Sequence, residues 1–473
     1  MNFYTLENEQ KLIDHLINLL ANKLNKKEED LQNIKEKFTT IISRTRDVSI
    51  EEILNVVFEL FSNELSELLT FKIAPAFQIG IQTESFKLIT YAGKQNGTKN
   101  ACDIDENTYF SFDSISKLIT STITMQEIRN TSLTLETKLH DFQPEFALNS
   151  KIEEILKFTS NVQTEKRLEN LSLEETIAIL KRTKENLEEK QLQKNFYLYN
   201  DIGYMILRLS IPNFLEKLNT LLSYIDSINL TYKTNSTQKN ITGGRINEEY
   251  ITPDQKGRTI PFPGHTGLYG NIQGLLNLMT KIFYTESILS KEEQTLLLKQ
   301  PYPDPRVYSK DGTPLPGKNN TYKYMAKIAG IYRKPTGILE DAYNKLSSCD
   351  MSNLTTDNAK SSAGTCGTWC IVDNLSIQNR FSNYSGGILT NPYSYIHKTS
   401  YPEEENIIPS TDLIVNKKGK INNYSTKLNT YKELITEYAL ILELVTEYIK
   451  EVDKQILTKK QYKLTKKIEE LPN

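Results

Sequence analysis

A serine and a lysine stand one helical turn apart at the start of an apolar run. The segment FSFDSISKLI contains Ser114 and Lys117 in the spacing Ser-x-x-Lys. On one face of a helix, such an amine can take the proton of the hydroxyl, which makes the serine a nucleophile toward a carbonyl carbon. The same spacing recurs at Ser236 and Lys239, inside a polar stretch typical of a solvated loop. Spacing alone is therefore weak evidence, and the surrounding sequence must decide.

Further motifs follow the serine in a fixed order. They are LTLETKL and QPEF at 133–146, ILKFTSN at 155–161, YNDIGY at 199–204, GHTGLYG at 264–270, SAG at 362–364, GTWCIVD at 367–373 and GILTN at 387–391. In this order the motifs resemble those of the serine β-lactamase and penicillin-binding-protein superfamily, in particular its class C-like branch of esterases and D-amino-acid peptidases. The resemblance covers roughly residues 72 to 450, and it implies that Ser114 and Lys117 are catalytic.

The second motif of that superfamily is Tyr-x-Asn. Here Tyr199 matches the tyrosine, Asn200 stands where a serine is usual, and Asp201 replaces the asparagine. The resemblance implies that position 201 belongs to the residues that bind the substrate. The resemblance implies that Tyr199 shuttles protons with Lys117. A carboxylate at position 201 would favour the protonated amine and so make it a poorer base, unless burial compensates. We expect Lys117 to act as a neutral amine, so hydrolysis should rise with pH.

The third motif, Lys or His followed by Thr or Ser and Gly, best matches Ser362 to Gly364, because strand-like residues follow it. The resemblance places this segment at the substrate and implies an oxyanion hole formed by the backbone N–H groups of Ser114 and Thr365. Ser362 lacks the usual cation, so we expect a neutral ester or amide to be preferred over a free carboxylate. The segment from His265 to Gly267 fits the motif letters better but lacks a following strand, and His265 is expected to be structural.

The resemblance implies an α+β fold, an antiparallel sheet flanked by helices with an inserted, mostly helical domain (β-lactamase/DD-peptidase-like). We expect a helical extension at 1–71, a sheet subdomain at 72–120 and 355–473, and a helical, loop-rich subdomain at 121–354. Local patterns agree: a hairpin at 71–91, a helix capped at Ser172 and reaching about Glu189, strands at 368–372 and 387–390, and a long C-terminal amphipathic helix. Prolines and glycines at 301–337 predict loops.

Composition narrows the partners and the location. The 473 residues include 57 basic and 59 acidic side chains, so no global field favours nucleic acid. The N-terminus lacks a secretory pattern, and no apolar stretch approaches the roughly 18 to 20 residues of a membrane span. Four scattered cysteines agree with a reducing compartment. We therefore expect a cytoplasmic protein, with packing or self-association through its N-terminal helices.

No metal site or cofactor is expected. The four histidines include no His-x-x-x-His pair. Cys366 and Cys370 are too far apart for one ion if their segment is extended. The sequence thus predicts a serine hydrolase that acts through an acyl-enzyme on an ester, amide or β-lactam-like carbonyl of a small molecule or peptide. The alternative is a catalytically weak or inactive β-lactamase-like scaffold used for binding.

Overall fold

The computed structural model describes residues 6–45, 49–69, 76–95, 102–160, 162–165, 168, 171–185, 199–232, 244–246, 249–251, 264–298, 332–333, 354–356, 359–363, 368–375, 381, 383–390, 420–452 and 462–467. The main helices are α1 (Leu6–Leu24), α2 (Gln32–Arg44), α3 (Ile50–Leu69), α4 (Ser116–Asn130), α5 (Leu139–Phe142), α6 (Ile152–Leu156), α7 (Leu173–Lys181), α9 (Ile202–Ser210), α10 (Phe214–Asp226), α12 (Ile272–Phe283), α13 (Lys291–Leu297) and α17 (Lys420–Val452). Two 3-10 turns, η1 (Glu28–Leu31) and η2 (Asp113–Ile115), precede α2 and α4.

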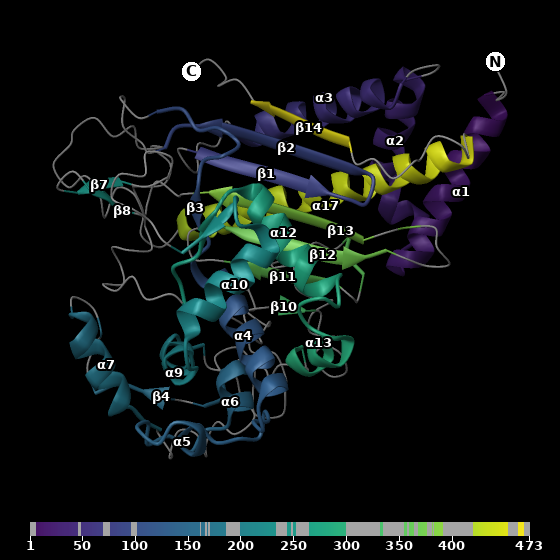
Figure 1. Ribbon diagram of the computed structural model, residues 1–473. Helices are drawn as coiled ribbons and strands as arrows, with labels where there is room; N and C mark the ends of the chain where they lie inside the picture. The colour runs from purple at the N-terminus through teal and green to yellow at the C-terminus, as the bar shows by residue number, and fades with distance from the viewer. Residues whose placement is uncertain are drawn as a thin grey trace.

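A seven-stranded sheet forms the centre of the molecule (Figure 1). Its order is β10 (Tyr332–Arg333), β11 (Lys360–Ala363), β12 (Trp369–Asn374), β13 (Asn383–Thr390), β1 (Ala76–Gln82), β2 (Phe86–Gly93) and β14 (Tyr462–Lys467). All neighbours are antiparallel except β14, which runs parallel to β2. The expected antiparallel sheet therefore has one parallel edge. Strands from both ends of the chain meet where β1 pairs with β13.

One long helix covers each face of the central strands. On one face α12 approaches so closely that a Cβ on Gly80 would lie 2.7 Å from Ile272 Cγ1. On the other face, α17 leaves only 2.6 Å between a Cβ on Gly386 and Ile435 Cγ2. Real Cβ atoms do not approach other heavy atoms this closely, so glycine at these two positions lets both helices pack onto the sheet.

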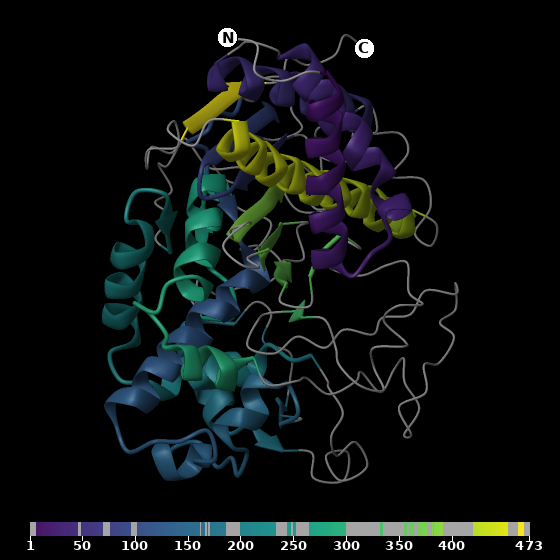
Figure 2. The ribbon, with the colours of Figure 1, turned by 90° about the vertical axis from the view of Figure 1, so that its right-hand side faces the viewer.

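The N-terminal helices pack against α17 on the side away from the inserted domain (Figure 2). Their apolar stripes are buried in the same hydrophobic cluster as α17 and one sheet face, with the Phe61 and Tyr438 rings 4.9 Å apart. A polar link crosses this contact: the Lys37 ammonium lies 2.6 Å from Glu64 and 2.9 Å from Glu437. These apolar stripes are used for packing within the chain. Self-association through the N-terminal helices stays a prediction.

A second hydrophobic cluster joins the opposite face of the sheet to the inserted helices, with α4 inside it. Small strands complete this half: β3 (Phe110–Ser111), β9 (Tyr269–Gly270) and β6 (Leu230–Thr231) form one sheet, β4 (Val162–Gln163) pairs with β5 (Lys184–Glu185), and β7 (Gly244–Ile246) pairs with β8 (Glu249–Ile251). The expected α+β fold, with an inserted and mostly helical region, is confirmed.

Local expectations mostly match the structure. The hairpin is β1 and β2, the late strands are β12 and β13, and α17 is the C-terminal helix. Ser172 caps α7 with a full capping box, but the expected extent to Glu189 is wrong. The helix ends at Lys181, because the next residues form β5 and pair with β4. The loops expected at 301–337 lie almost entirely outside the described residues. No described helix is both long and apolar enough to cross a membrane.

Candidate active site

Ser114 lies in the 3-10 turn η2, between β3 and α4. The turn is tight: Asp113 has φ +47°, a left-handed conformation that is uncommon outside glycine. The turn is tied on both sides, because Phe112 N donates to Leu268 O at 2.8 Å and the Thr368 hydroxyl donates to Ser111 O at 3.1 Å. A backbone so constrained positions the Ser114 hydroxyl at the start of a buried helix, as unusual φ values at functional sites often do.

The three expected catalytic side chains meet. Ser114 Oγ lies 2.7 Å from the Tyr199 hydroxyl, although 85 residues separate them in the chain. On its other side, Lys117 Nζ is 3.2 Å from Ser114 Oγ. The serine hydroxyl therefore has two hydrogen-bonding neighbours, each a group that can carry a proton.

The Lys117 ammonium is enclosed by acceptors. Its Nζ lies 3.2 Å from Ser114 Oγ, 3.0 Å from the carbonyl of His265 and 2.6 Å from Asp201 Oδ1. A protonated lysine has three N–H donors, so these three oxygens match its full capacity. The rings of Tyr199 and Tyr204 lie 5.0 and 6.0 Å from Nζ, a distance at which aromatic faces also favour a cation.

Charge decides the protonation of this lysine. Burial by itself would lower the pKa of Lys117, but the Asp201 carboxylate and Tyr199 more than offset it, so the pKa lies above the ordinary value for lysine. Burial raises the pKa of the Tyr199 phenol, the Lys117 charge opposes that rise, and the pKa of Tyr199 still ends above its ordinary value. At neutral pH the resting site therefore holds an ammonium and a neutral phenol, so a neutral amine forms only at higher pH.

An aromatic stack supports the tyrosine. Phe158 lies between Tyr199 and Tyr204, with ring centroids 4.9 and 5.1 Å away and nearly parallel planes. The backbone of Phe158 has a φ of +58°, which is strained for a bulky residue, and the side chain is buried. Phe158 belongs to the ILKFTSN motif at 155–161. Sequence reasoning missed its supporting role, and the aromatic residues at 158, 199 and 204 were the available signal.

Ser362 lies on β11, next to the β10 edge of the sheet, on the sheet face toward this site. It pairs with Cys370, whose side chain belongs to the cluster on the inserted-domain side, and directly paired residues share a face. Strand β11 also contacts the η2 turn that carries Ser114. Lys360 lies on the same face of β11, with its Nζ 5.7 Å from the Phe283 ring. Gly364 and Thr365, the other residues expected here, lie outside the described residues, so the oxyanion hole stays a prediction.

The loop around His265 contributes main-chain hydrogen-bond acceptors to the site. The carbonyls of Gly264 and His265 accept hydrogen bonds from Thr120 and Lys117. Sequence reasoning expected His265 to be structural and missed that its main-chain oxygen accepts a hydrogen bond from Lys117. Glycines at 264 and 267 have φ of +141° and +90°, which allow the turn.

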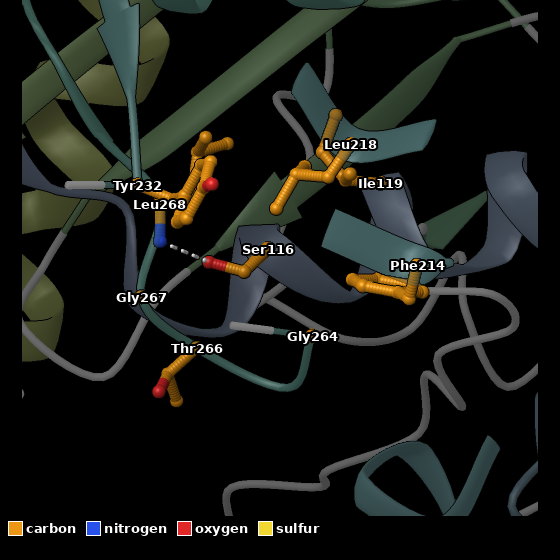
Figure 3. Close-up of a pocket in the computed structure, with 9 residues that line it drawn as sticks. All are labelled: Ser116, Ile119, Phe214, Leu218, Tyr232, Gly264, Thr266, Gly267 and Leu268. Carbon is orange, nitrogen blue, oxygen red and sulfur yellow. Dashed lines mark hydrogen bonds between the residues drawn. The ribbon is translucent and has the colours of Figure 1, made fainter. Parts of the chain in front are cut away.

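A small cavity lies beside the same loop (Figure 3). Figure 3 shows Ser116 accepting a hydrogen bond from the Leu268 amide at 3.0 Å. Ser116 lines this cavity, whereas Ser114 and Lys117 do not. The cavity is therefore distinct from the space around Ser114 Oγ. Within the described ranges, no group of His, Cys, Asp or Glu side chains is arranged to hold a metal ion.

Comparison with known proteins identifies the fold. No protein-family profile and no curated protein sequence matches the chain. Among solved structures, it is similar to the octameric penicillin-binding protein homologue from Pyrococcus abyssi, with a TM-score of 0.50, 16% identity, and coverage of 73% of this chain and 76% of that one. EstCE1, a hydrolase with promiscuous acyltransferase activity, gives a TM-score of 0.52 and 14% identity over 80% and 100% of the two chains.

A third similar structure is the D-amino acid amidase from Ochrobactrum anthropi SV3 in complex with L-phenylalanine amide. Its TM-score is 0.50 at 10% identity, over 83% of this chain and 99% of that one. The chain thus shares its fold with this penicillin-binding protein homologue, this hydrolase and this amidase. The expectation drawn from the motif order is confirmed at the level of the fold.

Proposed function

We propose that this protein is a serine hydrolase that forms an acyl-enzyme on Ser114 from an ester, amide or β-lactam-like carbonyl. One observation carries the proposal: Ser114 Oγ lies within hydrogen-bonding distance of both the Tyr199 phenol and the Lys117 amine. A nucleophile next to a base that is itself held in place is the arrangement that covalent catalysis requires. The fold shared with known hydrolases supports this function by analogy.

The proton path follows from these contacts. Ser114 Oγ attacks the carbonyl carbon while its proton passes to Lys117 or through Tyr199, and the C=O electron pair moves to the oxygen. Collapse of this intermediate breaks the bond to the leaving group, which takes the proton. Water then attacks the acyl-enzyme by the same route and restores Ser114. Which group accepts the first proton is disputed for related enzymes.

The residues of β11 near the site indicate which substrate charge is preferred. Ser362 offers a hydroxyl where the superfamily usually has a cation, and Lys360 is directed to the Phe283 ring. A charge-assisted hydrogen bond to a carboxylate is about twice as strong as a neutral one. We therefore propose a neutral ester or amide, and not a free acid, as the preferred small-molecule or peptide substrate.

A binding scaffold is the second candidate function. The ion pair between Lys117 and Asp201, at 2.6 Å, favours the protonated amine, which cannot accept a proton from Ser114. If the site never releases that proton, the fold serves recognition alone. This candidate predicts no covalent chemistry at Ser114 at any pH.

Reaction with a fluorophosphonate separates the two candidates. Intact-protein mass spectrometry should show one adduct on the wild type, formed faster at alkaline pH, and none on Ser114→Ala. Ser236 has a lysine at the same spacing but lies in a polar stretch, so Ser236→Ala is the control and should react like the wild type. An adduct that survives Ser114→Ala refutes the assignment of the nucleophile. Absence of any adduct on the wild type up to alkaline pH supports the scaffold.

A further inference from the structure

The two charged side chains of the ion pair beside Ser114 differ in their exposure to solvent. The Lys117 side chain is 0% exposed, whereas that of Asp201 is 25% exposed. Asp201 Oδ1 faces the ammonium and is itself buried, so the exposure falls on the rest of the side chain. Of the two charges, a molecule entering from solvent meets the negative one.

That carboxylate lies close to the reaction centre. Lys117 Nζ contacts both Ser114 Oγ and Asp201 Oδ1, so only one ammonium group separates the nucleophile from the carboxylate. Asp201 is also fixed in position, because it precedes α9 and its carbonyl accepts a hydrogen bond from Met205 N at 3.1 Å. A substrate whose carbonyl carbon reaches Ser114 therefore has the Asp201 carboxylate within one ammonium group of its reacting atom.

We propose that Asp201 determines substrate specificity by binding a positively charged ammonium group next to the scissile carbonyl. The inference rests on the proposed hydrolase function and names its substrate class, an ester or amide of an amino-bearing acid. A carboxylate prefers a charged donor, with which its hydrogen bond is about twice as strong as a neutral one. The same charge repels a substrate carboxylate, in agreement with the hydroxyl of Ser362 on β11.

Binding of such a group also acts on the base. A substrate ammonium shares the Asp201 carboxylate with Lys117, so it weakens the attraction that holds the proton on the lysine. Among the described residues, the groups around that amine are Asp201, Tyr199, Tyr204, Ser114 and the His265 carbonyl, and Asp201 is the one whose carboxylate pairs with it. Recognition of the substrate and activation of the base are thereby coupled.

Binding to a variant without the nucleophile tests recognition separately from chemistry. On the Ser114→Ala background, calorimetry compares alanine methyl ester, as either enantiomer, with methyl isobutyrate, in which a methyl group replaces the ammonium. Hydrogen bonds to charged groups contribute enough to predict a preference of about tenfold or more for one alanine ester, at a pH where its amine is protonated. Adding Asp201→Asn, a nearly isosteric change, should reduce the preference to about twofold or less.

Equal affinity for the two esters on the Ser114→Ala background overturns the proposal, and so does a preference that survives Asp201→Asn. The first comparison needs no change at Asp201, so it holds even if the double variant folds poorly. Hydrolysis of the same esters by the wild type is measured in parallel. A binding preference without Ser114-dependent hydrolysis would leave recognition by Asp201 standing and reject the hydrolase function.

Discussion

At the scale of single residues, Lys117 is the group on which the proposed chemistry depends most. Lys117→Ala removes the amine 3.2 Å from Ser114 Oγ, and we expect hydrolysis to fall about a hundredfold or more, the usual size of a general-base contribution. Lys117→Arg keeps a cation that cannot lose its proton in a protein, so it should not restore the rate. Ester hydrolysis under saturating substrate provides the measurement, and wild-type activity in either variant refutes the role.

Asp201 sets the pH at which that amine becomes available. Since the Asp201 charge raises the pKa of Lys117, the rate should increase with pH as the amine loses its proton. Asp201→Asn removes this charge and lowers the pKa, so the rising limb should move to lower pH and activity toward a neutral ester at pH 7 should increase. A pH–rate profile of both proteins tests this, and a limb that stays in place or moves to higher pH contradicts it.

We expect Ser362 to disfavour substrates that carry a free carboxylate. Ser362→Lys places a cation on β11, on the sheet face toward the site, so the rate with a free-acid substrate relative to its neutral ester should rise about tenfold. The measurement is the ratio of kcat/KM values for the two substrates. Lys360→Ala is the control, because it tests whether that lysine already supplies a charge. A wild type that prefers the acid, or a ratio unchanged in Ser362→Lys, contradicts this view of the pocket.

At the scale of elements, the closeness of α17 to the sheet depends on a missing side chain. Gly386→Ala puts a Cβ 2.6 Å from Ile435 Cγ2. This methyl group can move away only if Ile435 leaves its preferred χ1 rotamer or the helix shifts. Overpacking of this kind costs about 1–3 kcal/mol. Urea unfolding should show the loss, whereas Leu296→Ala at an exposed position should stay within about 0.5 kcal/mol of the wild type. Equal stability of Gly386→Ala and the wild type would mean that α17 shifts freely.

At the scale of the whole molecule, the N-terminal helices and the sheet share one hydrophobic cluster. Phe61 in α3 is buried against Tyr438 of α17, and the single tryptophan, Trp369, is buried in the same cluster. Phe61→Ala should therefore lower the free energy of unfolding by about 3–5 kcal/mol. The urea unfolding transitions measured by Trp369 fluorescence and by far-ultraviolet circular dichroism should both move to lower urea concentration. A tryptophan transition that stays at the wild-type urea concentration would show that the N-terminal helices unfold independently.

Short-range patterns carried much of this structure. The hairpin of β1 and β2, the strands β12 and β13, and the amphipathic α17 follow from side-chain periodicity, which reflects local backbone geometry. The local helical spacing Ser-x-x-Lys pointed to Ser114 and Lys117, and the motif order of the resemblance added Tyr199. The end of α7 was misplaced, since it depends on the pairing of β5 with β4 and not on helix propensity.

From local spacing and motif order, the sequence by itself thus predicted the class of fold and Ser114 as the candidate nucleophile. Only the tertiary structure decided that Asp201 pairs with Lys117, that the His265 carbonyl completes its shell, and that the N-terminal helices cover α17. The physical reason is that a charge acts across space. The effect of Asp201 on Lys117 depends on a distance between atoms far apart in the chain, which no local pattern records.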